Sequence, residues 1–180
     1  MITFISGGVR SGKSSLAEEI AVRQYQQNHP SGLFYVATAR PAIDEEMQKR
    51  IMLHQHSRGQ IWTTIEESYA IDRAIHDVPK RSVVLVDCLT VWSSNVLFSE
   101  RKNEQDMLAI MLRLFTLAKE KQLSLIFVSN DLNEALPVKD DWVQIYMRSL
   151  EAVHQFVVEH CDVAIQVIAG CPVYWKGCAS

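Results

Sequence analysis

The sequence predicts an α/β fold in which helices flank a mostly parallel β-sheet. Short apolar runs with strand composition alternate with longer stretches whose apolar residues recur at helical spacing. This alternation is typical of parallel strands joined by right-handed helical crossovers. A chain of 180 residues is long enough to bury one sizeable core, so we expect a single domain over residues 1–180.

Each strand and helix has its own justification in the sequence. Residues 82–87, S-V-V-L-V-D, are almost continuously apolar, as a central parallel strand should be, and residues 61–65 are rich in β-branched and aromatic types. By the same criteria, strands are expected at 2–5, 33–37, 61–65, 82–87, 123–128, 163–168 and 172–175. Helical spacing predicts helices at 15–21, 44–57, 69–77, 107–121 and 142–159.

Composition excludes several classes of protein. The net charge of −3 argues against a general nucleic-acid binder, which normally carries a basic excess. No apolar run reaches membrane-spanning length, and the N-terminus has no signal-peptide pattern. The four cysteines lack C-x-x-C spacing, so a zinc site is not expected. These features predict a cytoplasmic protein with reduced thiols and no membrane span.

The most specific motif lies between the first expected strand and the first expected helix. Residues 7–14 read G-G-V-R-S-G-K-S and match the phosphate-binding P-loop, G-x-x-x-x-G-K-[ST]. Glycines let backbone N–H groups converge on a phosphate, and the following helix adds its positive end. The lysine reaches the outer phosphates, and the serine hydroxyl can ligate Mg²⁺. The predicted nucleotide-binding residues here are Gly7, Gly8, Val9, Arg10, Ser11, Gly12, Lys13 and Ser14.

Two carboxylates follow buried strands. Asp87 ends the run 82–87, and ligands bind at the carboxyl ends of strands in open α/β sheets, so Asp87 is a candidate Mg²⁺ ligand together with Ser14. The alternative is that Asp87 caps the next helix. Asp131 follows the strand at 123–128 and indicates either a second polar group at this edge or a turn residue.

A basic face is predicted on the expected helix at 44–57. Arg50, His54 and Arg58 are spaced i, i+4 and i+8, which places them above one another on a helix. An imidazole between two guanidinium groups is pushed towards its neutral, nucleophilic form. Spacing alone also describes an exposed helix with scattered basic residues, and by itself it favours that interpretation.

Taken together, these segments resemble one family, the bifunctional adenosylcobinamide kinase/adenosylcobinamide-phosphate guanylyltransferases of cobalamin biosynthesis. The resemblance covers essentially the whole chain. It is carried by G-G-x-R-S-G-K-S at 7–14, Y-V-A-T at 35–38, the pattern D-x-E-M-x-x-R-I-x-x-H-x-x-x-R at 44–58, W-x-T-x-E at 62–66, D-C-L-T at 87–90, and Asn95.

The resemblance implies a RecA-like P-loop NTPase fold and a homotrimer. It implies that the γ-phosphate of ATP or GTP passes to adenosylcobinamide, and that His54 then attacks the α-phosphate of GTP. The guanylyl-histidine would pass GMP to adenosylcobinamide phosphate, a corrinoid substrate. Lys13 would act with His54 in catalysis, and Mg²⁺ would be the cofactor. The implied GTP-site residues beyond the P-loop are Thr38, Ala39, Arg40, Gln55, His56, Ser57, Arg58, Glu66 and Asp87.

One segment departs from the family pattern. Residues 133–137 read N-E-A-L-P, where the family has a glycine-rich stretch. Glycine permits close backbone approach to a ligand, so this difference bears on the loop that would face the corrinoid. Two alternative functions follow: a monofunctional P-loop kinase for a small molecule, or a GTP-binding regulatory module without transferase activity.

Overall fold

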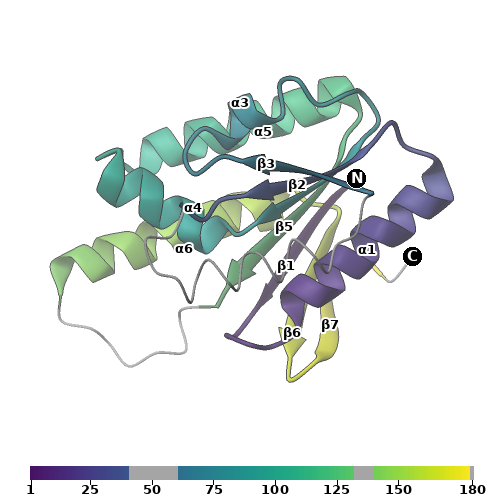
Figure 1. The fold of residues 1–180 in the computed structure, drawn as a ribbon. Helices are drawn as coiled ribbons and strands as arrows, with labels where there is room; N and C mark the ends of the chain where they lie inside the picture. Colours follow the sequence, from purple (N-terminus) through teal and green to yellow (C-terminus); the bar gives the residue numbers. More distant parts are fainter. Residues whose placement is uncertain (41–60, 132–139, 179–180) are drawn as a thin grey trace.

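The computed structural model describes residues 1–40, 61–131 and 140–178. Its centre is a sheet with the strand order β3-β2-β4-β5-β1-β6-β7 (Figure 1). Every pairing is parallel except the hairpin between β6 and β7. The strands are β1 (Ile2–Gly7), β2 (Leu33–Ala37), β3 (Trp62–Glu66), β4 (Val83–Asp87), β5 (Ser124–Asn130), β6 (Val163–Ile168) and β7 (Cys171–Lys176). The predicted fold class is confirmed.

Helices cover both faces of the sheet. They are α1 (Lys13–Asn28), α3 (Ile71–Ala74), α4 (Leu89–Ser94), the π-helical η1 (Asn95–Ser99), α5 (Glu104–Lys121) and α6 (Asp141–His160). Local sequence explains where the two longest begin. Asn103 and Asp106 form a reciprocal capping box at α5, and the Asp140 carboxylate accepts from two backbone N–H groups at the start of α6.

The alternation of side chains along the strands divides the core into two layers. Ile5 and Val128 point to one face and pack against Ala17 of α1. Phe4 and Phe127, their neighbours in sequence, point to the other face, where α4, α5 and α6 cover them. In Figure 1, α1 lies on one side of the sheet and the remaining helices lie on the other. We call these sides the α1 face and the α6 face.

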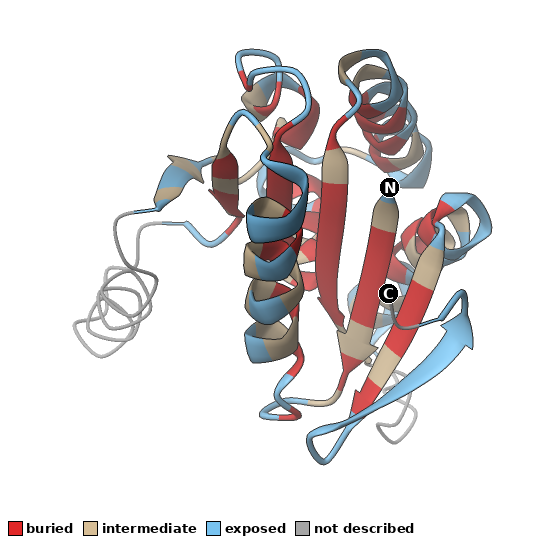
Figure 2. Ribbon diagram, turned by 90° about the vertical axis from the view of Figure 1, so that its right-hand side faces the viewer, coloured by how far each residue is buried: buried red, intermediate tan, exposed pale blue. Residues whose placement is uncertain are grey.

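Some elements differ from the sequence predictions. The expected helix at 69–77 is helical only over Ile71–Ala74. It begins after Ala70 because the Glu67 side chain accepts from the N–H groups of Tyr69 and Ala70 in a preceding turn. The helices at 89–99 were not predicted at all. The strand β7 is exposed along its whole length, whereas the central strands are buried (Figure 2). The expected helix at 44–57 lies outside the described residues.

None of the helices in the described parts of the chain is both long and apolar enough to cross a membrane. All four cysteines, Cys88, Cys161, Cys171 and Cys178, are free thiols.

Candidate nucleotide site

The P-loop joins β1 to α1 and is closely packed. A Cβ atom at Gly7 would lie 2.6 Å from both the Ser11 hydroxyl oxygen and the Val167 carbonyl oxygen, so only glycine fits there. Gly12 precedes α1 with φ of 91°, a conformation that side-chain-bearing residues rarely adopt. Two of the motif glycines are therefore required by the shape of the loop itself.

Lys13 lies inside this loop. Its side chain is buried, and its ammonium group donates a hydrogen bond to the Gly8 carbonyl oxygen at 3.0 Å. The Ser11 N–H donates to the same carbonyl oxygen at 3.2 Å, which curls the loop onto itself. Val9 and Arg10, at the tip, are exposed. The positively charged Lys13 ammonium and the N-terminal turn of α1 therefore lie together at the edge of the sheet, where both favour an anion.

Strand register brings the other predicted residues to the same edge. Gly7 pairs with Asn130 of β5 and with Val167 of β6, so the P-loop starts level with the ends of both strands. Ala37 pairs with Asp87 and with Glu66, which aligns the ends of β2, β3 and β4. The structure therefore brings the P-loop, residues 38–40, Glu66 and Asp87 to one carboxyl edge of the sheet.

Asp87 is held by a residue that the sequence analysis did not assign to the site. The Tyr35 hydroxyl donates to Asp87 Oδ2 at 3.0 Å. The residue that caps α4 is Cys88, without a side-chain capping hydrogen bond, so the helix-cap interpretation of Asp87 is wrong. Within the described ranges, no three His, Cys, Asp or Glu side chains gather as a preformed metal cage. A Mg²⁺ ion at Asp87 would therefore need further oxygen ligands, which phosphate groups and water commonly supply.

Thr38 and Asn95 lock the end of β2 to the end of β4. The Thr38 hydroxyl donates to the Cys88 carbonyl at 2.9 Å and accepts from the Cys88 N–H at 2.7 Å. The Asn95 amide donates to the Thr38 carbonyl at 2.9 Å and lies 3.4 Å from the Ser68 carbonyl. Asn95 is buried, and a buried side-chain amide requires hydrogen-bond partners, which the two carbonyl groups supply.

A second polar network lies on the α6 face, at the end of β5. The Ser129 hydroxyl lies 2.9 Å from the Thr90 hydroxyl and 2.7 Å from His154 Nε2 on α6. The Thr90 hydroxyl oxygen also accepts from the Asn130 N–H at 2.7 Å. Burial lowers the pKa of His154 to about 4, and the Asp131 carboxylate opposes that shift. The imidazole is therefore neutral at physiological pH.

Asp131 is anchored beside the P-loop. Its N–H donates to the Gly7 carbonyl at 3.1 Å, and its carboxylate accepts from the Gln166 side chain at 2.9 Å. The other end of the Gln166 amide accepts from the Trp175 indole N–H at 3.2 Å. Asp131 thus has its carboxylate held in place by side chains from β6 and β7.

Several predicted site residues lie outside the described part of the chain, namely Arg50, His54, Gln55, His56, Ser57 and Arg58. Residues 133–137 also lie outside it. Both interpretations of the basic helical face therefore stay predictions.

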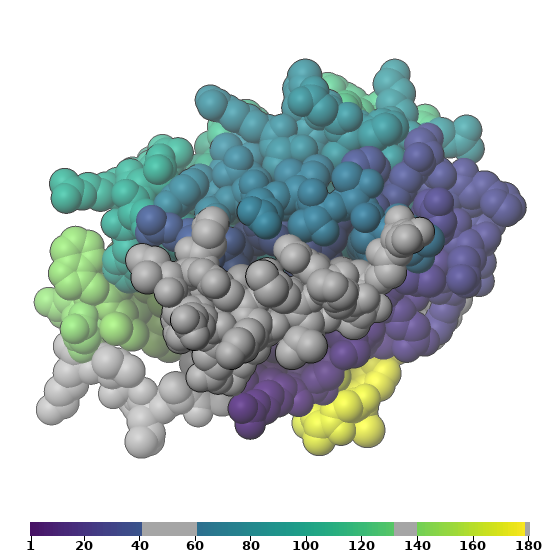
Figure 3. Space-filling view, viewed as in Figure 1, coloured from purple at the N-terminus to yellow at the C-terminus, as the bar shows by residue number. Residues whose placement is uncertain are grey.

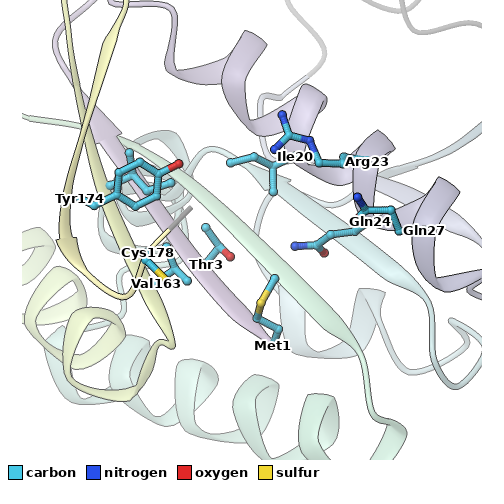
Figure 4. A pocket seen from close by; sticks show the side chains of 10 residues that line it. Met1, Thr3, Ile20, Arg23, Gln24, Gln27, Val163, Tyr174 and Cys178 are labelled. Atoms are coloured by element: carbon cyan, nitrogen blue, oxygen red, sulfur yellow. The ribbon is translucent and has the colours of Figure 1, made fainter. Parts of the chain in front are cut away.

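A small cavity elsewhere in the molecule is separate from this edge. It measures about 30 Å³ and lies between the C-terminal half of α1 and the start of β1, where Thr3, Gln24 and Tyr174 are among its lining residues (Figure 4). The P-loop is at the opposite end of both β1 and α1. The volume suits about one water molecule, so this cavity is not a nucleotide site.

Comparisons with known proteins agree with this arrangement. The model of the family "Cobinamide kinase / cobinamide phosphate guanyltransferase" matches residues 3–174. The "Bifunctional adenosylcobalamin biosynthesis protein CobP" of Pseudomonas aeruginosa is 33% identical over 180 residues, covering 98% of each chain. The CobU protein of Escherichia coli is 36% identical over 99 residues, covering 54% of this chain and 51% of that protein.

Among solved structures, the KaiC-like protein PH0186 of Pyrococcus horikoshii superposes with a TM-score of 0.55. The match covers 92% of this chain and 69% of that one, at 12% identity, and so supports the P-loop NTPase fold alone. Family match, full-length relative and site geometry converge: the chain belongs to the cobinamide kinase/cobinamide phosphate guanyltransferase family of cobalamin-biosynthesis enzymes.

Proposed function

We propose that this protein phosphorylates adenosylcobinamide with ATP or GTP and then transfers GMP from GTP to the product through a guanylyl-histidine at His54. The observation that carries the proposal is the buried Lys13 inside a closely packed P-loop, on the same edge of the sheet as Asp87. Family membership supports the two activities. The assignment of individual residues is ours.

The nucleotide phosphates would occupy the P-loop. Lys13 would exchange its hydrogen bond to the Gly8 carbonyl for the outer phosphate oxygens, and Arg10 at the exposed tip could reach the same charge. The hydroxyl of Ser14 and the carboxylate of Asp87 are hard oxygen donors that suit Mg²⁺. When bound, Mg²⁺ supplies positive charge to the phosphate oxygens. Thr38, Arg40 and Glu66, at the ends of β2 and β3, would line the rest of the site.

In the kinase step, the hydroxyl oxygen of the corrinoid bonds to the γ-phosphorus as the bond to the β–γ bridging oxygen breaks. The hydroxyl proton passes to water, and the nucleoside diphosphate departs. Because the charge builds on phosphate oxygens, Lys13 contributes by fixed electrostatic stabilisation. The P-loop orients the phosphates, so little covalent chemistry is required of the protein.

In the guanylyltransferase step, an imidazole nitrogen of His54 bonds to the α-phosphorus and pyrophosphate leaves. A phosphate oxygen of adenosylcobinamide phosphate then displaces the imidazole, which restores the enzyme. The covalent intermediate divides a transfer between two anions into two steps. The flanking Arg50 and Arg58, together with Gln55, His56 and Ser57, would bind and orient GTP.

Intact-mass spectrometry after incubation with GTP and Mg²⁺ tests this proposal. We expect one GMP adduct that is labile in acid and stable in alkali, absent from His54→Ala and present in His76→Ala, a control at an exposed histidine. An adduct that persists in His54→Ala would refute the assignment. Phosphorylation of adenosylcobinamide without any adduct would indicate the monofunctional kinase, and GTP binding without either reaction would indicate the regulatory module.

By the same resemblance we propose a cytoplasmic homotrimer of single-domain subunits, and sedimentation equilibrium would test that stoichiometry. With the family pattern of residues 133–137 altered, both half-reactions should be assayed separately.

A further inference from the structure

A large groove opens on the α6 face, between η1 with the turn that follows it and the first half of α6. Its volume is about 960 Å³, at the upper end of the range for small-molecule sites. In Figure 3 the two walls lie next to each other at the left, the teal segment near residue 100 above the green start of α6. The groove lining is Leu97, Phe98, Arg101, Lys102, Asn103, Glu104, Trp142, Ile145, Arg148 and Ser149.

The lining combines exposed apolar surface with positive charge. Trp142, Phe98 and Ile145 are 66%, 45% and 43% exposed, unusually open for large apolar side chains that share one groove. Arg101 and Arg148 are exposed and form no ion pair with any residue of the described chain. Lys102 adds a third cation, whose ammonium lies 3.7 Å from the Glu100 carboxylate, and Glu104 is the single carboxylate of the lining. The groove therefore suits a bulky, flat and largely apolar ligand that carries an anionic group.

Hydrogen bonds connect the walls of this groove to the nucleotide site. Tyr146 of α6, which follows Ile145 in the sequence, donates from its hydroxyl to the Thr90 carbonyl at 2.9 Å. Thr90 is three residues after Asp87. Its ring contacts Phe98 with centroids 5.9 Å apart. On the other wall, the Arg40 guanidinium donates to the Ser99 hydroxyl at 3.2 Å. The groove is thus joined to the ends of both β2 and β4.

We infer that this groove binds the corrinoid acceptor. The inference rests on the proposed function and adds the residues that hold its second substrate. A corrinoid is a wide, flat macrocycle with an aliphatic rim, and Trp142 and Phe98 offer it aromatic surface. Its substrate arm ends in a hydroxyl before the kinase step and in a phosphate afterwards. Arg148, Arg101 and Lys102 offer that phosphate charge-assisted hydrogen bonds.

The position also separates the two substrates. The helix that follows the P-loop packs on the α1 face, whereas the groove is formed by elements of the α6 face. The acceptor can then approach the carboxyl edge of the sheet from one side while the nucleotide phosphates are held from the other. Both substrates can be bound together, as direct transfer from the γ-phosphate requires.

Equilibrium dialysis with adenosylcobinamide and adenosylcobinamide phosphate tests the inference, because corrinoid absorbance reports binding without turnover. Trp142→Ala should raise the dissociation constant of both corrinoids about tenfold, as loss of an aromatic anchor does. Arg148→Glu should weaken the phosphorylated corrinoid about tenfold more than the unphosphorylated one, and this difference should shrink at high salt. Leu112→Ala and Lys80→Glu, at exposed positions outside the groove, are the matched controls.

Sedimentation velocity and GMP loading from GTP are measured on every variant. Weaker corrinoid binding with unchanged sedimentation and unchanged GMP loading supports the inference. Unchanged corrinoid affinity in both groove variants overturns it. Loss of affinity together with dissociation of an oligomer also overturns it and assigns the groove to a second copy of the chain. If the parent protein binds neither corrinoid, the proposed function itself fails, so the two failures are distinguishable.

Discussion

Acidification from pH 7 to pH 5 should destabilise the fold through the imidazole of His154. Its Nε2 lies 2.7 Å from the Ser129 hydroxyl oxygen, and its ring contacts Phe4 with centroids 5.2 Å apart. Burial lowers the pKa of His154 to about 4, although the Asp131 carboxylate favours the charged form. In the unfolded chain a histidine has a pKa of about 6.5, so the unfolded state binds this proton more readily.

The direction and size follow from proton linkage. The stability that depends on a neutral His154 is fully present above about pH 6.5 and is lost as the pH falls towards the folded pKa. With pKa values of about 4 folded and about 6.5 unfolded, the loss between pH 7 and pH 5 is about 2 kcal/mol. This is a large share of the roughly 5–15 kcal/mol that stabilises a typical domain.

Urea denaturation at pH 7 and pH 5 measures the effect. In His154→Gln the side chain cannot titrate, and its amide retains a hydrogen-bonding group for Ser129. Between pH 7 and pH 5, the free energy of unfolding should fall by about 2 kcal/mol more in the parent protein than in this variant. His76→Gln, at an exposed position, should lose as much as the parent. Parallel losses in the parent and His154→Gln would refute the reasoning.

Three further predictions concern the site. Lys13→Ala should lower kcat/KM of both half-reactions by about 100-fold or more, with an unchanged circular dichroism spectrum. Full activity would contradict a shared phosphate site. Gly7→Ala should abolish nucleotide binding in calorimetric titration and lower the midpoint of thermal unfolding, because the added methyl group would overlap two oxygen atoms. Gly8→Ala is the control: an added Cβ there meets nothing within 4 Å, so the midpoint of thermal unfolding should not change. Asn95→Ala should lower the free energy of unfolding, measured by urea denaturation, by about 1–3 kcal/mol, since it removes the amide donor from two carbonyl groups. A change near zero would show that water hydrogen-bonds these carbonyls in place of the amide.

The strands and the P-loop were predictable because their signals are local. The strands at 33–37 and 163–168 match β2 and β6 residue for residue, and the other strands differ by one or two residues at their ends. The helices at 89–99 were missed because the segment L-T-V-W-S-S-N-V-L-F-S is short and mixes polar with apolar residues. Leu89, Trp92 and Val96 are buried at helical spacing, but Thr90, Ser93 and Asn95 are buried as well, which obscures an apolar stripe in the sequence. Packing against the rest of the core, and not local helix propensity, made this segment helical.

The sequence by itself determined the phosphate loop, the succession of strands along the chain, and the placement of polar residues at strand ends, since each depends on residue type within a few positions. Only the tertiary structure decided which of those residues support one another. Ser129 meets His154, and Thr38 meets Asn95, across separations of 25 and 57 residues. The groove likewise exists because η1 and α6 pack side by side. Such contacts depend on how whole elements pack on the sheet, and local patterns do not encode that packing residue by residue.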